Sequence, residues 1–137
     1  MKKTVFTFLF ALLSSFCFSQ QSPDEFEMKE GDTTYIMKKY YLVLLKRGTK
    51  AKEYTKEELT KIQNGHLANI NKLAQQGYLD IAGPMDKDED LRGIFIIKNV
   101  KNEEEAKKLV DTDPAVIAGR LSYEIHPWWA AKGSCLK

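Results

Sequence analysis

The sequence predicts an α+β fold of the ferredoxin-like type, with an antiparallel sheet and both helices on one of its faces. Three observations predict it. Short apolar runs with the length of strands occupy residues 40–46, 78–84 and 91–99. Residues 120–129 alternate between apolar and polar side chains, and two segments with helix caps separate the strands. The order along the chain is therefore β, α, β, β, α, β.

The first strand and the first helix have the clearest boundaries. Residues 40–46 are almost continuously apolar, as in a central strand with little solvent contact. Thr55 and Glu58 have the spacing of a capping box, which predicts that a helix begins directly after Thr55. Gly77 suits the left-handed residue that follows the end of a helix.

The second half of the chain repeats this pattern. Asn102 is expected to cap a helix over residues 103–110, whose first turn is acidic. Asp113 and Pro114 form an N-cap and N1 pair for one further helical turn, which Gly119 ends. The elements after residue 100 are thus a helix, a helical turn and the final strand.

The face of the sheet away from the helices predicts a homodimer. Central strands carry apolar side chains on both faces, and a chain of this length has no further element to cover the second face. We expect two copies to pack sheet on sheet and to bury aromatic residues such as Tyr123 and Trp128. His126 alternates with the apolar positions of its strand and is expected to face away from them.

The amino terminus has the pattern of an export signal. Two lysines precede the apolar run VFTFLFALL, and small residues follow it, so residues 1–19 are interpreted as a signal peptide that is cut after Ser19. A lipoprotein is the alternative because Cys17 follows the apolar run, but Phe16 fits a lipid-attachment site poorly. The expected location is periplasmic or secreted, without a membrane anchor after cleavage.

The remaining 118 residues are expected to form one domain. Residues 20–36 are interpreted as a flexible polar arm, residues 37–130 as the folded domain and residues 131–137 as a tail. Cleavage lowers the count of Lys and Arg from 21 to 19, which equals the 19 Asp and Glu, so the mature net charge is zero. This balance argues against nucleic acid as a partner.

A histidine lies in the middle of the apolar stripe of the first helix. Leu59, Ile62, Ile70 and Leu73 lie within roughly 40° of His66 on the helical wheel. A buried imidazole needs a hydrogen-bond partner, so His66 is either a satisfied core residue or the floor of a cavity.

The expected partner of this histidine is Asp86. A strand that ends at Gly83 and Pro84 would leave the sheet sharply, which places Asp86 at the mouth of a gap between the helix and that strand. A carboxylate beside an imidazole fixes its tautomer, as a general acid or base requires.

These segments also resemble a known family. HLANINKLAQQGYLDIAGP, LRGIFII, EEEAKKLVDTDPAVIAGRL and EIHPWW, together with Asp86, are similar to the YciI-like, or YCII-related, proteins over about residues 40–129. The resemblance implies a dimeric α+β barrel built from ferredoxin-like subunits. It also implies a site with a histidine and an aspartate, here His66 and Asp86, and small-molecule substrates, with elimination chemistry on ring compounds in some relatives.

Other candidate sites are weaker. Arg92 would bind an anionic substrate group or form a salt bridge with the acidic turn before it, and Trp128 would line a pocket or close an interface. The acidic turn lacks the glycine and the final glutamate of a calcium loop, because Leu91 and Ile97 occupy those positions. With two histidines and no CxxC or phosphate-binding loop, the sequence predicts no metal and no cofactor.

The function predicted from the sequence is a small-molecule enzyme that uses His66 and Asp86 for general acid–base chemistry, either proton abstraction or elimination. The alternative is a dimeric module that binds a small molecule without turnover. A third interpretation assigns His66 to the core alone.

Overall fold

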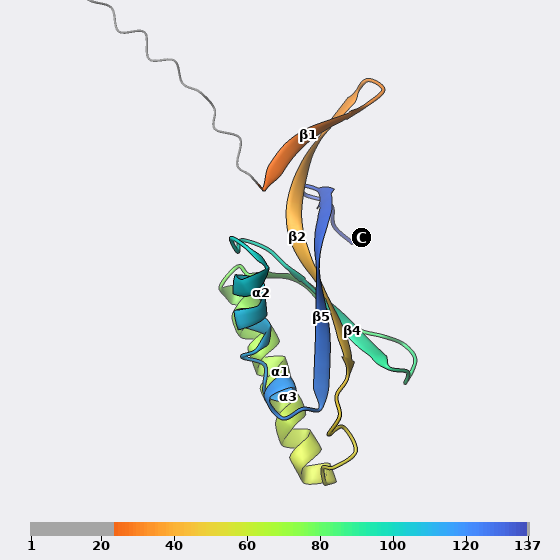
Figure 1. The fold of residues 1–137 in the computed structure, drawn as a ribbon, viewed down its shortest axis with the longest axis vertical. Coiled ribbons are helices and arrows are strands. Elements are labelled where there is room, and N and C mark those ends of the chain that lie inside the picture. The colour runs from red at the N-terminus through yellow and green to blue at the C-terminus, as the bar shows by residue number, and fades with distance from the viewer. Residues whose placement is uncertain (1–23, 137) are drawn as a thin grey trace, which may run out of the picture.

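The computed structural model describes residues 24–136, which form an antiparallel sheet with helices on one face (Figure 1). The elements are β1 (Glu25–Glu30), β2 (Thr33–Arg47), α1 (Lys56–Gln75), β3 (Leu79–Pro84), β4 (Leu91–Ile97), α2 (Glu103–Val110), α3 (Pro114–Ile117) and β5 (Leu121–Ala131). From β2 onward this is the predicted β-α-β-β-α-β order, with the helical turn α3 before the last strand. The ferredoxin-like prediction is confirmed. The predicted signal peptide, residues 1–19, lies outside the described residues.

The long strand β2 lies at the centre of the sheet. Its residues 41–46 pair with both β4 and β5, so these two strands occupy opposite edges of β2. Residues 37 and 38 pair with both β1 and β5, which puts β1 on the same edge as β4, further along β2. The four strands nearest the helices therefore run in the order β3-β4-β2-β5, and β1 extends the sheet beyond them.

The core lies between the helices and one face of this sheet. Residues directly opposite in an antiparallel pair share a face. Val43 lies opposite Phe95 in β4 and Ile125 in β5, and Val43 and Phe95 belong to the core while Ile125 packs against it. Leu73 from α1 and Val110 from α2 pack against the same cluster. Burial of this face holds both long helices on the sheet.

Tyr123 belongs to the helix-covered face, which corrects the expectation that it lies in a sheet-on-sheet interface. It is opposite Leu45 in the register and packs against the core. Its hydroxyl donates a hydrogen bond to Asp111 at the end of α2 and accepts one from Lys107 at 3.1 Å. Burial, followed by the hydrogen bond to Asp111, raises the pKa of Tyr123. The alternation that turns His126 away from the helices turns Tyr123 toward them.

Residues 25–36, which belong to the segment expected to be a flexible arm, instead form part of a β-hairpin, and residues 20–23 of that segment lie outside the described residues. β1 pairs with the first part of β2 from Glu25 opposite Lys38 to Glu30 opposite Thr33, which leaves a two-residue turn. Gly31 in that turn has φ +58°, a conformation that favours glycine. The alternation of apolar with polar side chains over residues 25–30 is the strand pattern that the high content of charged residues obscured.

The predicted helix boundaries are confirmed. Thr55 is the N-cap of α1, and both hydrogen bonds of the capping box with Glu58 are present. Gly77 follows the end of α1 with φ +79°. Asn102 caps α2 through the backbone N–H of Glu105 at 2.9 Å. Within residues 24–136, no helix is long and apolar enough to cross a membrane.

Candidate active site

A cavity of about 540 Å³ lies between α1 and the end of the sheet where β2 stops and β5 begins. This volume is in the range of pockets that hold small molecules. Apolar side chains of α1 and β4 form much of its wall, namely Leu59, Leu67, Ile70 and Phe95. Polar side chains lie at several points around it, namely Arg47, Gln63, His66, Asp88, Arg92 and Arg120.

His66 lines this cavity from the middle of α1. Its side chain is 12 % exposed. The imidazole stacks on the ring of Phe95, with the ring centroids 6.0 Å apart and an angle of 23° between the planes. Its Nδ1 atom lies 2.7 Å from Oδ2 of Asp113. The histidine thus has the hydrogen-bond partner that a buried imidazole needs. It is also in contact with a cavity, so it is not enclosed by core side chains alone.

Asp113 holds the imidazole in place through its position at the start of α3. Its side chain is fully buried, and Oδ1 accepts a hydrogen bond from the backbone N–H of Ala115 at 2.8 Å. The predicted N-cap role is therefore confirmed, and the second carboxylate oxygen is the one that binds His66. Because an ionised carboxylate only accepts hydrogen bonds, Nδ1 must donate, which leaves Nε2 of His66 for a ligand.

Asp86 is not the partner of His66, contrary to the sequence-based expectation. Asp86 is exposed and is absent from the cavity lining, and no hydrogen bond or ion pair within the described part of the chain joins it to His66. The reason is the path of the backbone. Met85 N donates to Arg92 O at 2.9 Å, so strand pairing continues past Pro84 instead of leaving the sheet there. The turn begins later and carries Asp86 to the surface.

The sequence predicts one property that allows Asp113 to bind His66. It predicts Asp113 as an N-cap, and an N-cap carboxylate uses one oxygen for the helix and leaves the other free. What the sequence did not show is that α3 packs beside α1, which brings residues 47 positions apart to 2.7 Å. Such a contact depends on tertiary packing.

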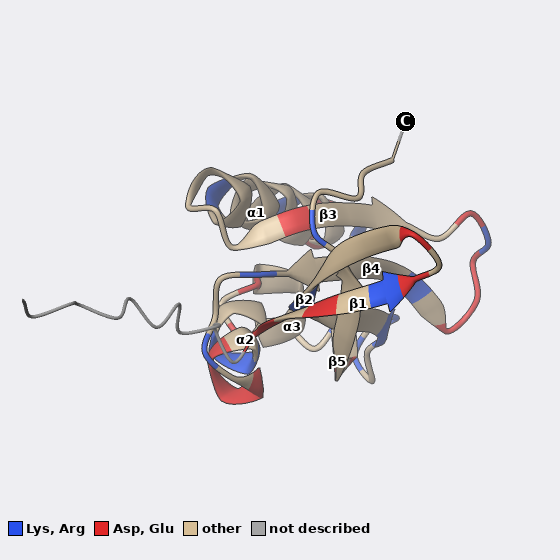
Figure 2. Cartoon of the chain, turned by 90° about the horizontal axis from the view of Figure 1, so that it is seen from above, with Lys and Arg blue, Asp and Glu red and all other residues tan. Residues whose placement is uncertain are grey.

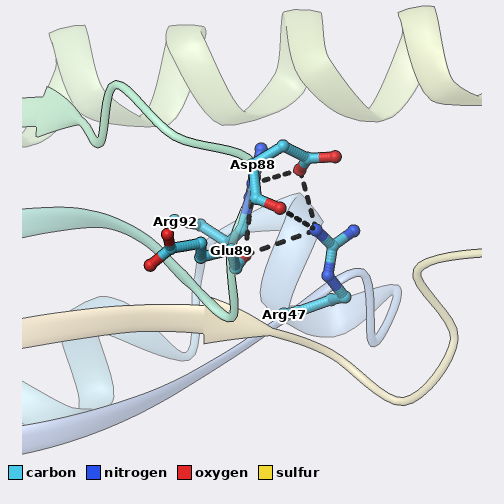
Figure 3. A network of polar contacts seen from close by, with 4 residues as sticks. All are labelled: Arg47, Asp88, Glu89 and Arg92. Atoms are coloured by element: carbon cyan, nitrogen blue, oxygen red, sulfur yellow. Dashed lines mark hydrogen bonds and ion pairs between the residues drawn. The ribbon is translucent and has the colours of Figure 1, made fainter.

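A second polar group of the cavity lining involves the acidic loop between β3 and β4, whose charged residues are coloured in Figure 2. Arg47 binds Asp88 Oδ1 at 2.7 Å, and Arg92 binds the same oxygen (Figure 3). The hydrogen bond from Arg47, followed by the charges of both arginines, lowers the pKa of Asp88. The predicted salt bridge between Arg92 and the acidic turn is present, and it also places Arg92 on the cavity wall.

Sequence reasoning missed two further arginines of the cavity. Arg47 is the last residue of β2, and Arg120 directly precedes β5. The guanidinium group of Arg120 donates a hydrogen bond to the side-chain oxygen of Gln63 in α1 at 2.7 Å. Neither belongs to a motif, so no local signal distinguished them from other surface cations. They converge because β2 and β5 are paired antiparallel, which puts the end of one beside the start of the other.

Comparison with known proteins identifies a family. The family model described as YCII-related domain matches residues 40–129. The chain belongs to the YCII-related family. His66, Asp113 and all three cavity arginines lie within the matched range, whereas β1 of the hairpin precedes it.

One solved structure similar to this YCII-related protein is 5-chloro-2-hydroxyhydroquinone dehydrochlorinase (TftG) from Burkholderia phenoliruptrix AC1100, in complex with 2,5-dihydroxybenzoquinone. The sequences are 20 % identical, the match covers 66 % of this chain and 92 % of that chain, and the TM-score is 0.46. No curated protein matches this chain.

Trp128 of the YCII-related domain does not reach the cavity, contrary to the expectation that it binds substrate there. It lies opposite Tyr40 in the register, on the face of the sheet away from the helices, and the two rings are 6.1 Å apart. The physical reason is strand alternation, because Trp128 shares a face with His126 and not with Tyr123. Within residues 24–136, no group of His, Cys, Asp and Glu side chains has the arrangement of a metal site.

Proposed function

We propose that this YCII-related protein is a small-molecule enzyme in which His66 transfers a proton to or from the substrate and Asp113 positions the imidazole. One observation carries the proposal. A fully buried carboxylate binds Nδ1 of a histidine that lines a cavity of about 540 Å³. A purely structural pair would not need the imidazole at the wall of a cavity.

The arrangement suits proton abstraction from a carbon or hydroxyl group. Nε2 of His66 accepts the proton, and the carboxylate of Asp113 stabilises the imidazolium that forms. Where the substrate carries a leaving group on the next carbon, the electrons of the broken C–H bond form a double bond and the leaving group departs with its bonding pair. The proton on Nε2 then passes to the leaving group or to water. A positioned group of this kind contributes about 10²- to 10⁴-fold in rate.

The test is hydrogen exchange at carbon, which detects proton abstraction even when no product accumulates. The protein is incubated in D2O with phenolic and carbonyl compounds, and the loss of C–H signals is followed by proton NMR. His66→Gln should lower the exchange rate by about 10²-fold or more. His126→Gln is the matched control because that histidine lies on the other face of the sheet. Equal rates in the two variants would contradict the proposal.

A binding module without turnover is the competing function, since the fold alone does not distinguish it from an enzyme. It predicts a ligand whose affinity depends on His66 but whose C–H groups do not exchange. The NMR experiment separates the two, because binding changes chemical shifts and catalysis removes signals.

We also propose that the protein is a homodimer. The strand register places Leu42, Leu44 and Ile94 together on the face of the sheet away from the helices, and each is partly exposed. Covering this apolar face with a second copy would remove it from water. Light scattering at micromolar concentration should give twice the mass of one chain. Leu44→Lys should give a monomer, and Thr60→Lys on the exposed side of α1 should not.

A further inference from the structure

The charged groups that line the cavity are unbalanced, although the chain as a whole carries a formal net charge of only +2. Arg47, Arg92 and Arg120 contribute three guanidinium groups, while Asp88 is the one carboxylate among the described residues of the lining. Arg120 is paired with the neutral amide of Gln63. Excess positive charge in a recess with apolar walls concentrates small anions.

The side chain of Asp88 occupies the position that a bound carboxylate would take. One of its oxygens lies between Arg47 and Arg92 and accepts hydrogen bonds from both (Figure 3). Two arginines that converge on one carboxylate oxygen form a carboxylate-binding arrangement, whatever molecule supplies the oxygen. The chain itself thus shows which group this pair of arginines fits.

Asp88 is weakly held at this position. Its side chain is 78 % exposed, and ion pairs at a surface contribute little to stability. The backbone at both ends of the loop is fixed, because Met85 N donates to Arg92 O and Arg47 N donates to Asp90 O at 2.7 Å. Rotation of the Asp88 side chain is therefore enough to clear the arginines, without opening the loop.

Backbone contacts also hold the two arginines in place. The carbonyl oxygen of Glu89 accepts hydrogen bonds from Arg47 and Arg92, each at 3.3 Å. These backbone contacts do not depend on the Asp88 side chain. The guanidinium groups are thus already oriented for another carboxylate, which lowers the entropy that binding must overcome.

We propose that the ligand of this cavity is a small organic carboxylate, whose carboxylate group displaces the Asp88 side chain from Arg47 and Arg92. The apolar wall formed by Leu59, Ile70 and Phe95 then holds the hydrocarbon part of the ligand, next to His66. This inference rests on the proposed function, because it names the substrate class of the same cavity. Asp88 acts as an internal competitor that fills the site until the ligand arrives.

The experiment measures the affinity of the protein for benzoate, with benzamide as the neutral ligand of the same shape, by isothermal titration calorimetry. Asp88→Asn removes the competing carboxylate and should strengthen benzoate binding about three- to fivefold. Glu89→Gln is the matched control, since it removes one negative charge from the same loop while only its backbone contacts the arginines. Arg92→Gln and Arg47→Gln should each weaken benzoate binding about tenfold. Benzamide affinity should not change in any of these variants.

Several results would overturn the inference. Equal benzoate affinity in Asp88→Asn and Glu89→Gln would show an effect of loop charge alone. Undiminished binding in both arginine variants, or no benzoate binding to Asp88→Asn, would also reject it.

His66→Gln separates this inference from the proposed function. If His66→Gln loses hydrogen exchange but retains benzoate, both stand. If no variant alters exchange while the arginine variants lose benzoate, the carboxylate site stands and the catalytic proposal fails.

Discussion

The histidine region and the acidic-loop region of the site hold carboxylates in opposite ways. Asp113 is fully buried and binds both His66 of the cavity lining and a helix N-terminus, while Asp88 of the lining is 78 % exposed and binds two arginines. A buried carboxylate that loses its partners has no water to replace them, whereas an exposed one does. The Asp113 carboxylate is therefore part of the folded core, and the Asp88 carboxylate is exchangeable. This contrast suits a site that needs one fixed group for chemistry and one replaceable contact for a ligand.

The largest effect is expected from Asp113→Ala, which removes the partner of His66 and the cap of α3 together. We expect the free energy of unfolding to fall by at least about 3 kcal/mol, because breaking a buried pair leaves the other member without a partner. Urea denaturation measures it. Asn102→Ala removes the cap of α2 alone and should cost about 1 kcal/mol. If the two losses are equal, the His66 contact does not contribute to stability.

The second prediction concerns the coupling between the two members of the buried pair. His66→Leu leaves the Asp113 carboxylate without that hydrogen bond and should cost about 1 to 3 kcal/mol. The double variant with Asp113→Asn should be more stable than the sum of the single changes predicts, by about 0.5 to 3 kcal/mol. A double-mutant cycle by chemical denaturation measures this coupling free energy. Strict additivity would mean that the 2.7 Å contact contributes nothing.

A pair of glycines in the cavity lining, on the adjacent strands β3 and β4, tests how rigid the cavity wall is. A Cβ at Gly93 would lie 2.6 Å from the carbonyl oxygen of Gly83, so Gly93→Ala must displace backbone. We expect a loss of about 1 to 3 kcal/mol. A Cβ at Gly83 meets nothing within 4 Å, and Gly83→Ala should leave the melting temperature unchanged or slightly higher. Equal effects would show that the wall adjusts freely.

The smallest effect is expected at the exposed carboxylate of Asp88. The pKa of Asp88 is lowered by its hydrogen bond to Arg47, so any stability from this contact is present above the ordinary pKa of an aspartate. It is lost as the pH falls through the lower value in the folded protein. Because the carboxylate is in water, Asp88→Asn should lower the melting temperature at pH 7 only slightly, and the melting curves of the two proteins should coincide in acid. A loss of stability at pH 7 as large as that of Asp113→Ala would place Asp88 in the same class as Asp113.

The contrast also separates what local patterns could predict from what they could not. The caps at Thr55, Asn102 and Asp113 were predicted, because a cap is made by residues within three positions of one another. The hairpin over residues 25–36 was missed, although its alternation is also local, because its charged residues resemble those of a flexible segment. The prediction that Tyr123 lies in an interface was wrong, since it needed the side of the sheet that the helices cover.

The sequence by itself determined the order of strands and helices from β2 onward, the positions of the helix ends and the choice of His66 as the unusual polar residue of an apolar stripe. These features depend on periodicity and on neighbours along the chain. The tertiary structure alone decided that Asp113 and not Asp86 binds His66, and that Arg47 and Arg92 share Asp88. Those contacts join residues 4 to 47 positions apart. The two longer ones depend on how the helices and strands pack.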